Sequence, residues 1–166
     1  MRSAWPWFAA SAAVVAADRL TKWLILGWLR PGDTVEITGF FNLVLVYNRG
    51  AAFSFLASAP GWQTPFFVAV ALIASGVVSW LLLRHPRQRL LCAGLALILG
   101  GALGNLVDRI QNGAVTDFAH VPYIPLFQVF NVAHASICVG AVVVLALGFF
   151  DRQEPATAPA PQSESR

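Results

Sequence analysis

The chain contains few charged residues. Aspartate, glutamate, lysine and arginine make up 11% of its 166 residues, whereas a soluble globular chain usually carries about 25%. Hydrophobic residues make up 57%, and the mean hydropathy is +0.65. With so little charge, the chain could not cover a water-soluble core. The composition therefore excludes an ordinary soluble protein, and the length suits one domain.

Cysteines and metal-ligand patterns are scarce too. Cys92 and Cys138 both fall in apolar stretches, which predicts buried free thiols rather than a disulfide framework. The net charge of +3 comes without a basic helix or interleaved aromatic and basic residues, so no nucleic-acid partner is expected. His85, His120 and His134 lie on different segments, without the spacing of a metal site, and we expect no metal or cofactor.

Four stretches are apolar enough to cross a hydrocarbon core, which takes about 20 residues. They are residues 5–29, 65–83, 90–107 and 129–150. The first is interrupted by charged residues between Asp18 and Lys22. A cleaved signal peptide is the alternative for this segment, because Arg2 and an Ala-rich apolar run precede Asp18. The apolar character resumes at Trp23, which favours a permanent helix.

The loops predict an orientation. The linker 84–89 is short, contains three arginines and no acid, and is therefore expected in the cytoplasm. Four spans then place both termini in the cytoplasm and residues 30–64 and 108–128 outside. Alternating and β-branched residues between positions 34 and 47 predict a short hairpin or small sheet on the outer face. Residues 1–150 are expected to form one membrane domain, and the Pro-, Ala- and Ser-rich residues 151–166 a disordered cytoplasmic tail.

Polar residues within or against a membrane are costly, so each is a candidate for function. Asp18 and Lys22 are four apart and share a helix face, either as a structural ion pair or as organisers of a site. At the outer end of the third stretch, Asn105, Asp108 and Arg109 share a face. Nearby Gly100 and Gly104 form a small-residue pattern typical of close helix packing, which does not explain the polar residues.

Three further positions stand in connectors or at a span entrance. Asn48 begins a loop that enters the second span, where an ordinary loop is the simpler interpretation. Asp117 lies in the outer connector, and its apolar neighbours predict partial burial that would raise its pKa. Asn131 and His134 are three apart at the start of the fourth span, where a single histidine is more often a packed residue than a catalyst.

Taken together, five blocks in order resemble the bacterial lipoprotein signal peptidase (signal peptidase II) family over residues 5–150. The blocks are Asp18-Arg19-Leu20-Thr21-Lys22, Asn48-Arg49-Gly50-Ala51-Ala52-Phe53-Ser54, Gly100 to Arg109, Val115 to Phe118, and Phe130-Asn131-Val132-Ala133. The resemblance implies an intramembrane aspartic endopeptidase of the bacterial inner membrane. Such enzymes remove signal peptides from diacylglyceryl-modified prolipoproteins by cutting before the lipidated cysteine. The implied fold is an all-α integral membrane bundle of four helices, with a small periplasmic β-platform and a periplasmic loop over the site.

The resemblance also implies residue roles. Asp117 matches the first catalytic aspartate, and seven residues match polar positions that shape and support the site: Asp18, Lys22, Asn48, Asn105, Asp108, Arg109 and Asn131. The family motif continues Phe-Asn-x-Ala-Asp, and that aspartate is the second catalytic residue, but here the position holds His134. An aspartate–histidine pair still contains a base and a hydrogen-bonding acid, so activity with an altered pH optimum is expected. The expected partners are prolipoproteins and membrane lipid, and the expected state is a monomer.

Two alternative functions would each explain part of the sequence. A non-hydrolytic relative would keep the polar groove and bind lipidated precursor peptides without cleaving them, because one member of the catalytic pair is replaced at His134. A small transporter or channel would account for the spans and the intramembrane charges. It would not account for the five ordered blocks, and no inverted repeat is apparent.

Overall fold

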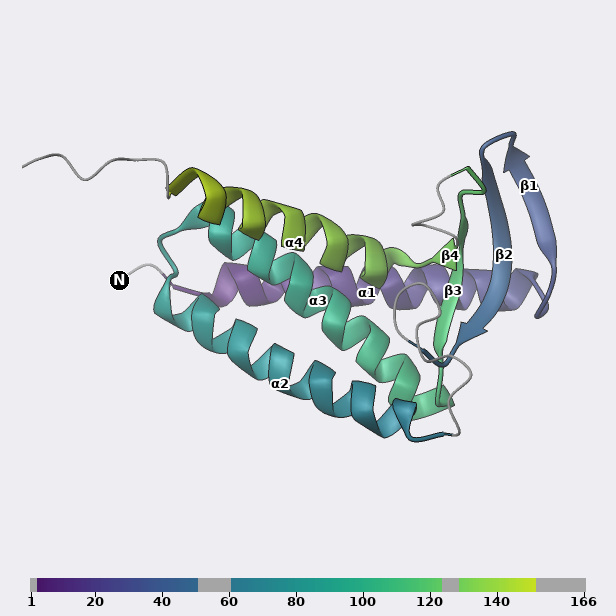
Figure 1. The fold of residues 1–166 in the computed structure, drawn as a ribbon, viewed down its shortest axis with the longest axis horizontal. Helices are drawn as coiled ribbons and strands as arrows, with labels where there is room; N and C mark the ends of the chain where they lie inside the picture. The colour runs from purple at the N-terminus through teal and green to yellow at the C-terminus, as the bar shows by residue number, and fades with distance from the viewer. Residues whose placement is uncertain (1–2, 51–60, 124–128, 152–166) are drawn as a thin grey trace, which may run out of the picture.

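The computed structural model describes residues 3–50, 61–123 and 129–151 of the chain. In order, its elements are α1 (Trp5–Trp28), β1 (Thr34–Thr38), β2 (Phe41–Asn48), α2 (Gln63–Arg84), α3 (Arg89–Asn112), β3 (Val115–His120), β4 (Val129–Phe130) and α4 (Val132–Asp151). The four helices form an elongated bundle, and the sheet lies across one end of it (Figure 1). Residue 151 of the predicted tail ends α4. The rest of the tail and the connectors 51–60 and 124–128, where a loop over the site would fall, lie outside the described residues.

Three helices have the length and apolarity of membrane spans: α2, α3 and the Val132–Phe149 part of α4. The chain is therefore a multi-pass membrane protein. The first predicted span, α1, is one helix of 24 residues that continues through the charged residues between Asp18 and Lys22. The helix continues because Asp18 and Lys22 turn inward and pair with each other instead of facing lipid. That α1 also crosses the membrane remains a prediction.

Helix α3 is the centre of the bundle and packs against α1, α2 and α4. The predicted small-residue face makes this possible. A Cβ atom on Gly100 would lie 2.6 Å from Val14 Cβ in α1, and one on Gly101 would lie 2.3 Å from the Ala133 carbonyl oxygen in α4. Both cysteines are free, as predicted, but only Cys92 is fully buried, while Cys138 is half-buried.

The predicted hairpin is confirmed as β1 and β2, but the sheet is larger than expected. It has four antiparallel strands in the order β1-β2-β3-β4. Strand β3 places Asp117 in the sheet and not in an irregular connector, and β4 takes Val129 and Phe130 out of the predicted fourth span. The sheet is anchored to the last turns of α1 by an apolar cluster that contains Ile25, Leu29, Leu45, Phe118 and Ala119.

Helix α3 ends where it must meet the sheet. Gly113 follows the helix with φ +71°, a left-handed conformation that glycine adopts without the steric cost of a Cβ atom, and its N–H donates to the Arg109 carbonyl. The chain then enters β3 within two residues. This tight connection brings the polar end of α3 next to Asp117.

Candidate functional site

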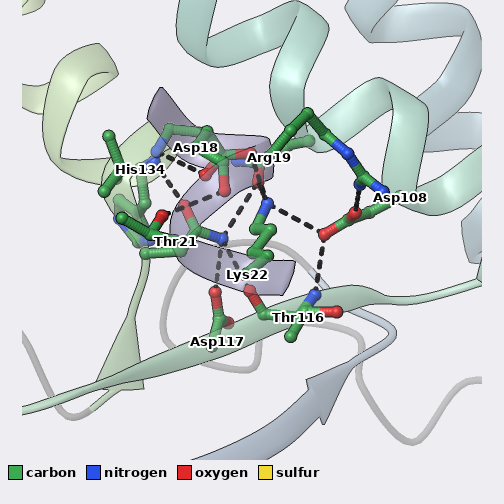
Figure 2. A network of polar contacts seen from close by, with 12 residues as sticks. Asp18, Arg19, Thr21, Lys22, Asp108, Thr116, Asp117 and His134 are labelled. Carbon is green, nitrogen blue, oxygen red and sulfur yellow. Dashed lines mark hydrogen bonds and ion pairs between the residues drawn. The ribbon is translucent and has the colours of Figure 1, made fainter. Parts of the chain in front are cut away.

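A buried lysine between two carboxylates forms the centre of the site. Lys22 Nζ donates to Asp18 Oδ2 at 2.7 Å and to Asp108 Oδ2 at 2.8 Å, which joins α1 to α3 (Figure 2). The three residues are 0–1% exposed. Such a cluster is tolerable in a low-dielectric interior only when every charge is paired, because an uncompensated buried charge costs several kcal/mol, on the order of 3–5. The predicted ion pair between Asp18 and Lys22 is confirmed, and Lys22 also pairs with a second acid, Asp108.

The surplus negative charge of this cluster is balanced from its edge. Arg19, partly exposed on α1, forms an ion pair with Asp108 Oδ1 and also donates to Gln111 Oε1. On its other oxygen, Asp108 accepts the backbone N–H of Thr116 at 3.0 Å. Asp108 thus fixes the position of β3 one residue before Asp117.

Two amide side chains hold the carboxylate of Asp117. Asn48 Nδ2 donates to Oδ2 at 3.1 Å, and Asn131 Nδ2 donates to Oδ1 at 2.7 Å. The register of the sheet explains the first bond: Asn48 pairs with Val115 and Val46 pairs with Asp117, so Asn48 and Asp117 are diagonal neighbours across β2 and β3. Asn48 is therefore a site residue and not part of an ordinary loop.

Burial changes the acidity of Asp117. The side chain is 3% exposed, and removal from water raises its pKa to about 6. The bond from Asn48 and the positive charges of Lys22 and Arg109 lower the pKa in part, while the charge of Asp108 raises it. The sequence-based expectation of a raised pKa is confirmed. A carboxyl group that ionises near neutral pH is suited to accept and return a proton.

The first turn of α4 is held by two side-chain caps. Asn131 Oδ1 accepts the backbone N–H of His134 at 2.7 Å, as an N-cap residue does at the third helical position. Asp18 Oδ1 accepts the N–H of Ala133 at 2.9 Å from the neighbouring helix. Gly104 makes room for that carboxylate, since a Cβ atom there would lie 2.8 Å from Asp18 Oδ2. Asn131 therefore links Asp117 directly to the backbone of His134.

Asn105 and Arg109 serve different parts of the site. Asn105 Oδ1 accepts from Asn131 at 3.0 Å and from Lys22 at 3.4 Å. Arg109 instead donates to the Gly50 carbonyl at 2.9 Å, and its guanidinium lies 5.1 Å from the ring centroid of Phe67 in α2. Arg109 thus reaches Gly50, the last described residue before the 51–60 connector.

Hydrogen bonds and ion pairs connect eight of the nine predicted residues, with His134 joined through its backbone N–H: Asp18, Lys22, Asn48, Asn105, Asp108, Asp117, Asn131 and His134. Arg109 is coupled to Asp117 by charge. Sequence reasoning missed the roles of Arg19 and of the Thr116 and Ala133 backbone N–H groups. Arg19 lies in one of the five sequence blocks, so a signal for it was available. A backbone N–H group gives no such signal, because every residue except proline has one.

Within the described ranges, no three His, Cys, Asp or Glu side chains are grouped as metal ligands.

The fold and this site define a class: a multi-pass membrane protein with a buried, charge-balanced carboxylate site where its helices meet a small sheet. Comparison with known proteins narrows the class. The profile of "Signal peptidase (SPase) II" matches residues 10–150. The chain therefore belongs to the signal peptidase II family, a family of peptidases.

Individual relatives agree with this assignment. A "Lipoprotein signal peptidase" of Ralstonia nicotianae is 49% identical over 147 residues, which cover 84% of this chain and 82% of the relative. A protein of the same name from Cupriavidus necator is 47% identical over 141 residues, covering 84% and 80%. Two solved bacterial membrane enzymes share the fold: one has a TM-score of 0.83 at 23% identity and covers 94% of both chains. The other has a TM-score of 0.77 at 26% identity and covers 88% of this chain and 94% of its own.

Proposed function

We propose that the chain is an aspartic-type intramembrane endopeptidase that removes signal peptides from diacylglyceryl-modified prolipoproteins, cutting before the lipidated cysteine. The observation that carries this proposal is Asp117. It is a buried carboxyl group with a pKa of about 6, held by two amide donors beside the first turn of α4. Membership of the signal peptidase II family supplies the substrate class.

Two assignments of the proton transfers are proposed for Asp117 and His134. In the first, ionised Asp117 orients a neutral His134, which takes a proton from the attacking water and later returns that proton to the departing amine. In the second, ionised Asp117 takes the proton from water, while a protonated His134 polarises the scissile carbonyl and donates its own proton to the departing amine. Both require Asp117 to be ionised at the start.

The surrounding residues are proposed to hold this pair in position. Lys22 keeps Asp18 and Asp108 compensated, so that Asp18 can cap α4 next to His134 and Asp108 can fix β3 next to Asp117. Asn105 and Asn131 extend the same network between α3 and α4. Arg109, through Gly50, positions the chain that enters the 51–60 connector.

The proposed arrangement in the membrane follows from the helices and the linker charges. All four helices cross the bacterial inner membrane, with residues 84–89 and both termini in the cytoplasm. The sheet and Asp117 then lie at the periplasmic end, where the lipidated cysteine of a translocated precursor is located. The protein is expected to act as a monomer.

One observation favours a second candidate function. On the resemblance, His134 takes the position of the second catalytic aspartate, and a site with one carboxylate could bind lipidated precursor peptides without cleaving them. This impaired relative would use the same site and the same supporting residues. Binding without turnover, together with turnover in a His134→Asp variant, would identify it.

The substrate assignment is tested with two synthetic peptides of one sequence, which differ only in whether the cysteine carries a diacylglyceryl group. Purified protein should cleave the lipidated peptide and leave the unmodified one intact, and the mass of the products should place the cut before the cysteine. Equal cleavage of both peptides, or a cut elsewhere, would contradict the proposed specificity.

A further inference from the structure

The end of the bundle opposite the sheet carries a separate feature, formed by the N-terminal residues of α1 and the connection from α2 to α3 (Figure 1). Two adjoining cavities lie there. One, of about 510 Å³, is lined by Ala4 and by residues 83–88. The other, of about 650 Å³, lies between the start of α3 and the end of α4 and is called here the α3–α4 groove. Neither contacts the residues of the Asp117 site.

The α3–α4 groove has a basic rim and an apolar wall. Arg87, Gln88 and Arg89 line its rim, and its wall is formed by Leu90, Leu91, Val144, Leu147 and Gly148. Arg87 and Arg89 are exposed, and neither forms an ion pair within the described part of the chain. No residue that lines the two cavities, within the described part of the chain, is an acid.

The position of the groove along the helices sets its surroundings. α2 ends at Arg84 and α3 begins at Arg89, so these arginines stand where two apolar membrane helices terminate. That level corresponds to lipid headgroups whichever way the protein is oriented. Arg84 also lies 5.5 Å from the ring centroid of Trp80, an aromatic contact typical of a side chain at the membrane interface.

We propose that the α3–α4 groove binds one anionic phospholipid, with its phosphate at Arg87 and Arg89 and an acyl chain along Leu91 and Leu147. Two guanidinium groups offer planar, paired donors to phosphate oxygens. The apolar wall continues from that rim toward the membrane interior, as a molecule with a charged head and a hydrocarbon tail requires. Basic pockets between membrane helices are known to select such headgroups.

Native mass spectrometry of the full chain in detergent tests this proposal, with phosphatidylglycerol and phosphatidylcholine of matched acyl chains added in equal amounts. We expect phosphatidylglycerol to be retained in preference, and an Arg87→Gln/Arg89→Gln variant to bind it about fivefold more weakly for each arginine removed. Arg84→Gln is the matched control, since Arg84 lines only the neighbouring cavity, and it should retain the lipid. Leu147→Trp, which narrows the apolar wall and leaves all charges in place, should also reduce retention.

Three results would overturn the proposal. Equal retention of both lipids would show that the groove does not select charge. If Arg84→Gln lowers the retention of phosphatidylglycerol as much as the double variant does, the general positive charge of this end, and not the groove, attracts the lipid. Displacement of phosphatidylglycerol by excess inorganic phosphate, with no effect of Leu147→Trp, would identify a phosphate site without a lipid chain.

Discussion

The Nδ2 atom of Asn131 lies 2.7 Å from Oδ1 of Asp117, and the Oδ1 atom of the same asparagine accepts the backbone N–H of His134 at 2.7 Å. One side chain therefore spans from the only described buried acid of the sheet to the first turn of α4. The two residues that the sequence singled out as a catalytic pair are held by a common partner. This relationship makes the effects of local substitutions specific enough to predict.

The activity should depend on the ionisation of Asp117. Both proposed assignments need the carboxylate, and its pKa is about 6, so the cleavage rate should rise as pH increases through about 6. Below that pH the carboxyl group is protonated and can neither accept a proton nor orient His134 as a base. A pH–rate profile measured under kcat/KM conditions checks this, and a rate that falls over the same interval would contradict it.

Asn48→Ala should shift the pH–rate profile of peptide cleavage to higher pH. The Asn48 bond lowers the pKa of Asp117, so its removal should raise the pKa further and shift the acid limb to higher pH. Asn42→Ala, on the same strand and paired with His120, is the matched control and should leave the limb in place. If both variants give the profile of the parent chain, the Asn48 bond does not set the acidity of Asp117.

His134→Asp should change the pH profile in a different manner. In the proposed pair, two carboxylates repel each other when both are ionised, whereas an aspartate and a histidine attract each other when both are charged. The apparent pKa values of the pair must therefore change. Cleavage assays between about pH 4 and 9 compare the two proteins, a range that covers the usual pKa values of both groups. Superimposable profiles would exclude His134 from the proton-transfer pair.

Lys22→Met should destabilise the fold strongly. The substitution leaves Asp18 and Asp108 buried without their shared counter-charge, a change that typically costs about 3–5 kcal/mol of unfolding free energy. Denaturation in detergent measures the loss. Arg30→Met, which removes an exposed cation, is the control and should have an effect of less than about 1 kcal/mol.

Gly104→Ala tests the close approach of α1, α3 and α4. The added Cβ atom would lie 2.8 Å from Asp18 Oδ2 and 3.2 Å from Ala133 Cβ, so we expect a loss of about 1–3 kcal/mol in stability. Gly27→Ala is matched in chemistry and also lies within a helix, but it has no neighbour within 4 Å. That variant should be neutral or stabilised by up to about 1 kcal/mol, because alanine favours helix. Equal effects of the two variants would refute the packing explanation.

The sequence predicted the helices well because each apolar stretch has a local cause. Stretches 65–83 and 90–107 have no charge to interrupt them, and α2 and α3 extend a few residues beyond each. The boundaries were less predictable where a tertiary partner decides them. Phe130 is apolar enough to begin a membrane helix, but it pairs with Ala119 in the sheet, and Asn131 starts the helix as its cap.

The sequence identified most residues of the site, but not how they contact one another. The free-energy cost of placing charged side chains in a membrane pointed to Asp18, Lys22 and Asp108, and the family resemblance gave Asp117 its catalytic role. No local pattern could place Asp117 in a strand, because β3 is defined by its long-range pairing with β2. For the same reason, the second acid on Lys22 and the caps on Ala133 and His134 emerge only when α1, α3 and α4 are packed together.

The central claim is that Asp117 is the group on which peptide cleavage depends, and Asp117→Asn tests it most directly. The amide has the same shape and cannot act as a base. Its oxygen can still accept the bond from Asn131, while the bond from Asn48 is lost. With the diacylglyceryl-modified peptide as substrate, we predict a rate reduced by at least about 10²-fold, in a variant whose thermal unfolding transition shows that it remains folded. Cleavage by Asp117→Asn at the parental rate would contradict the account.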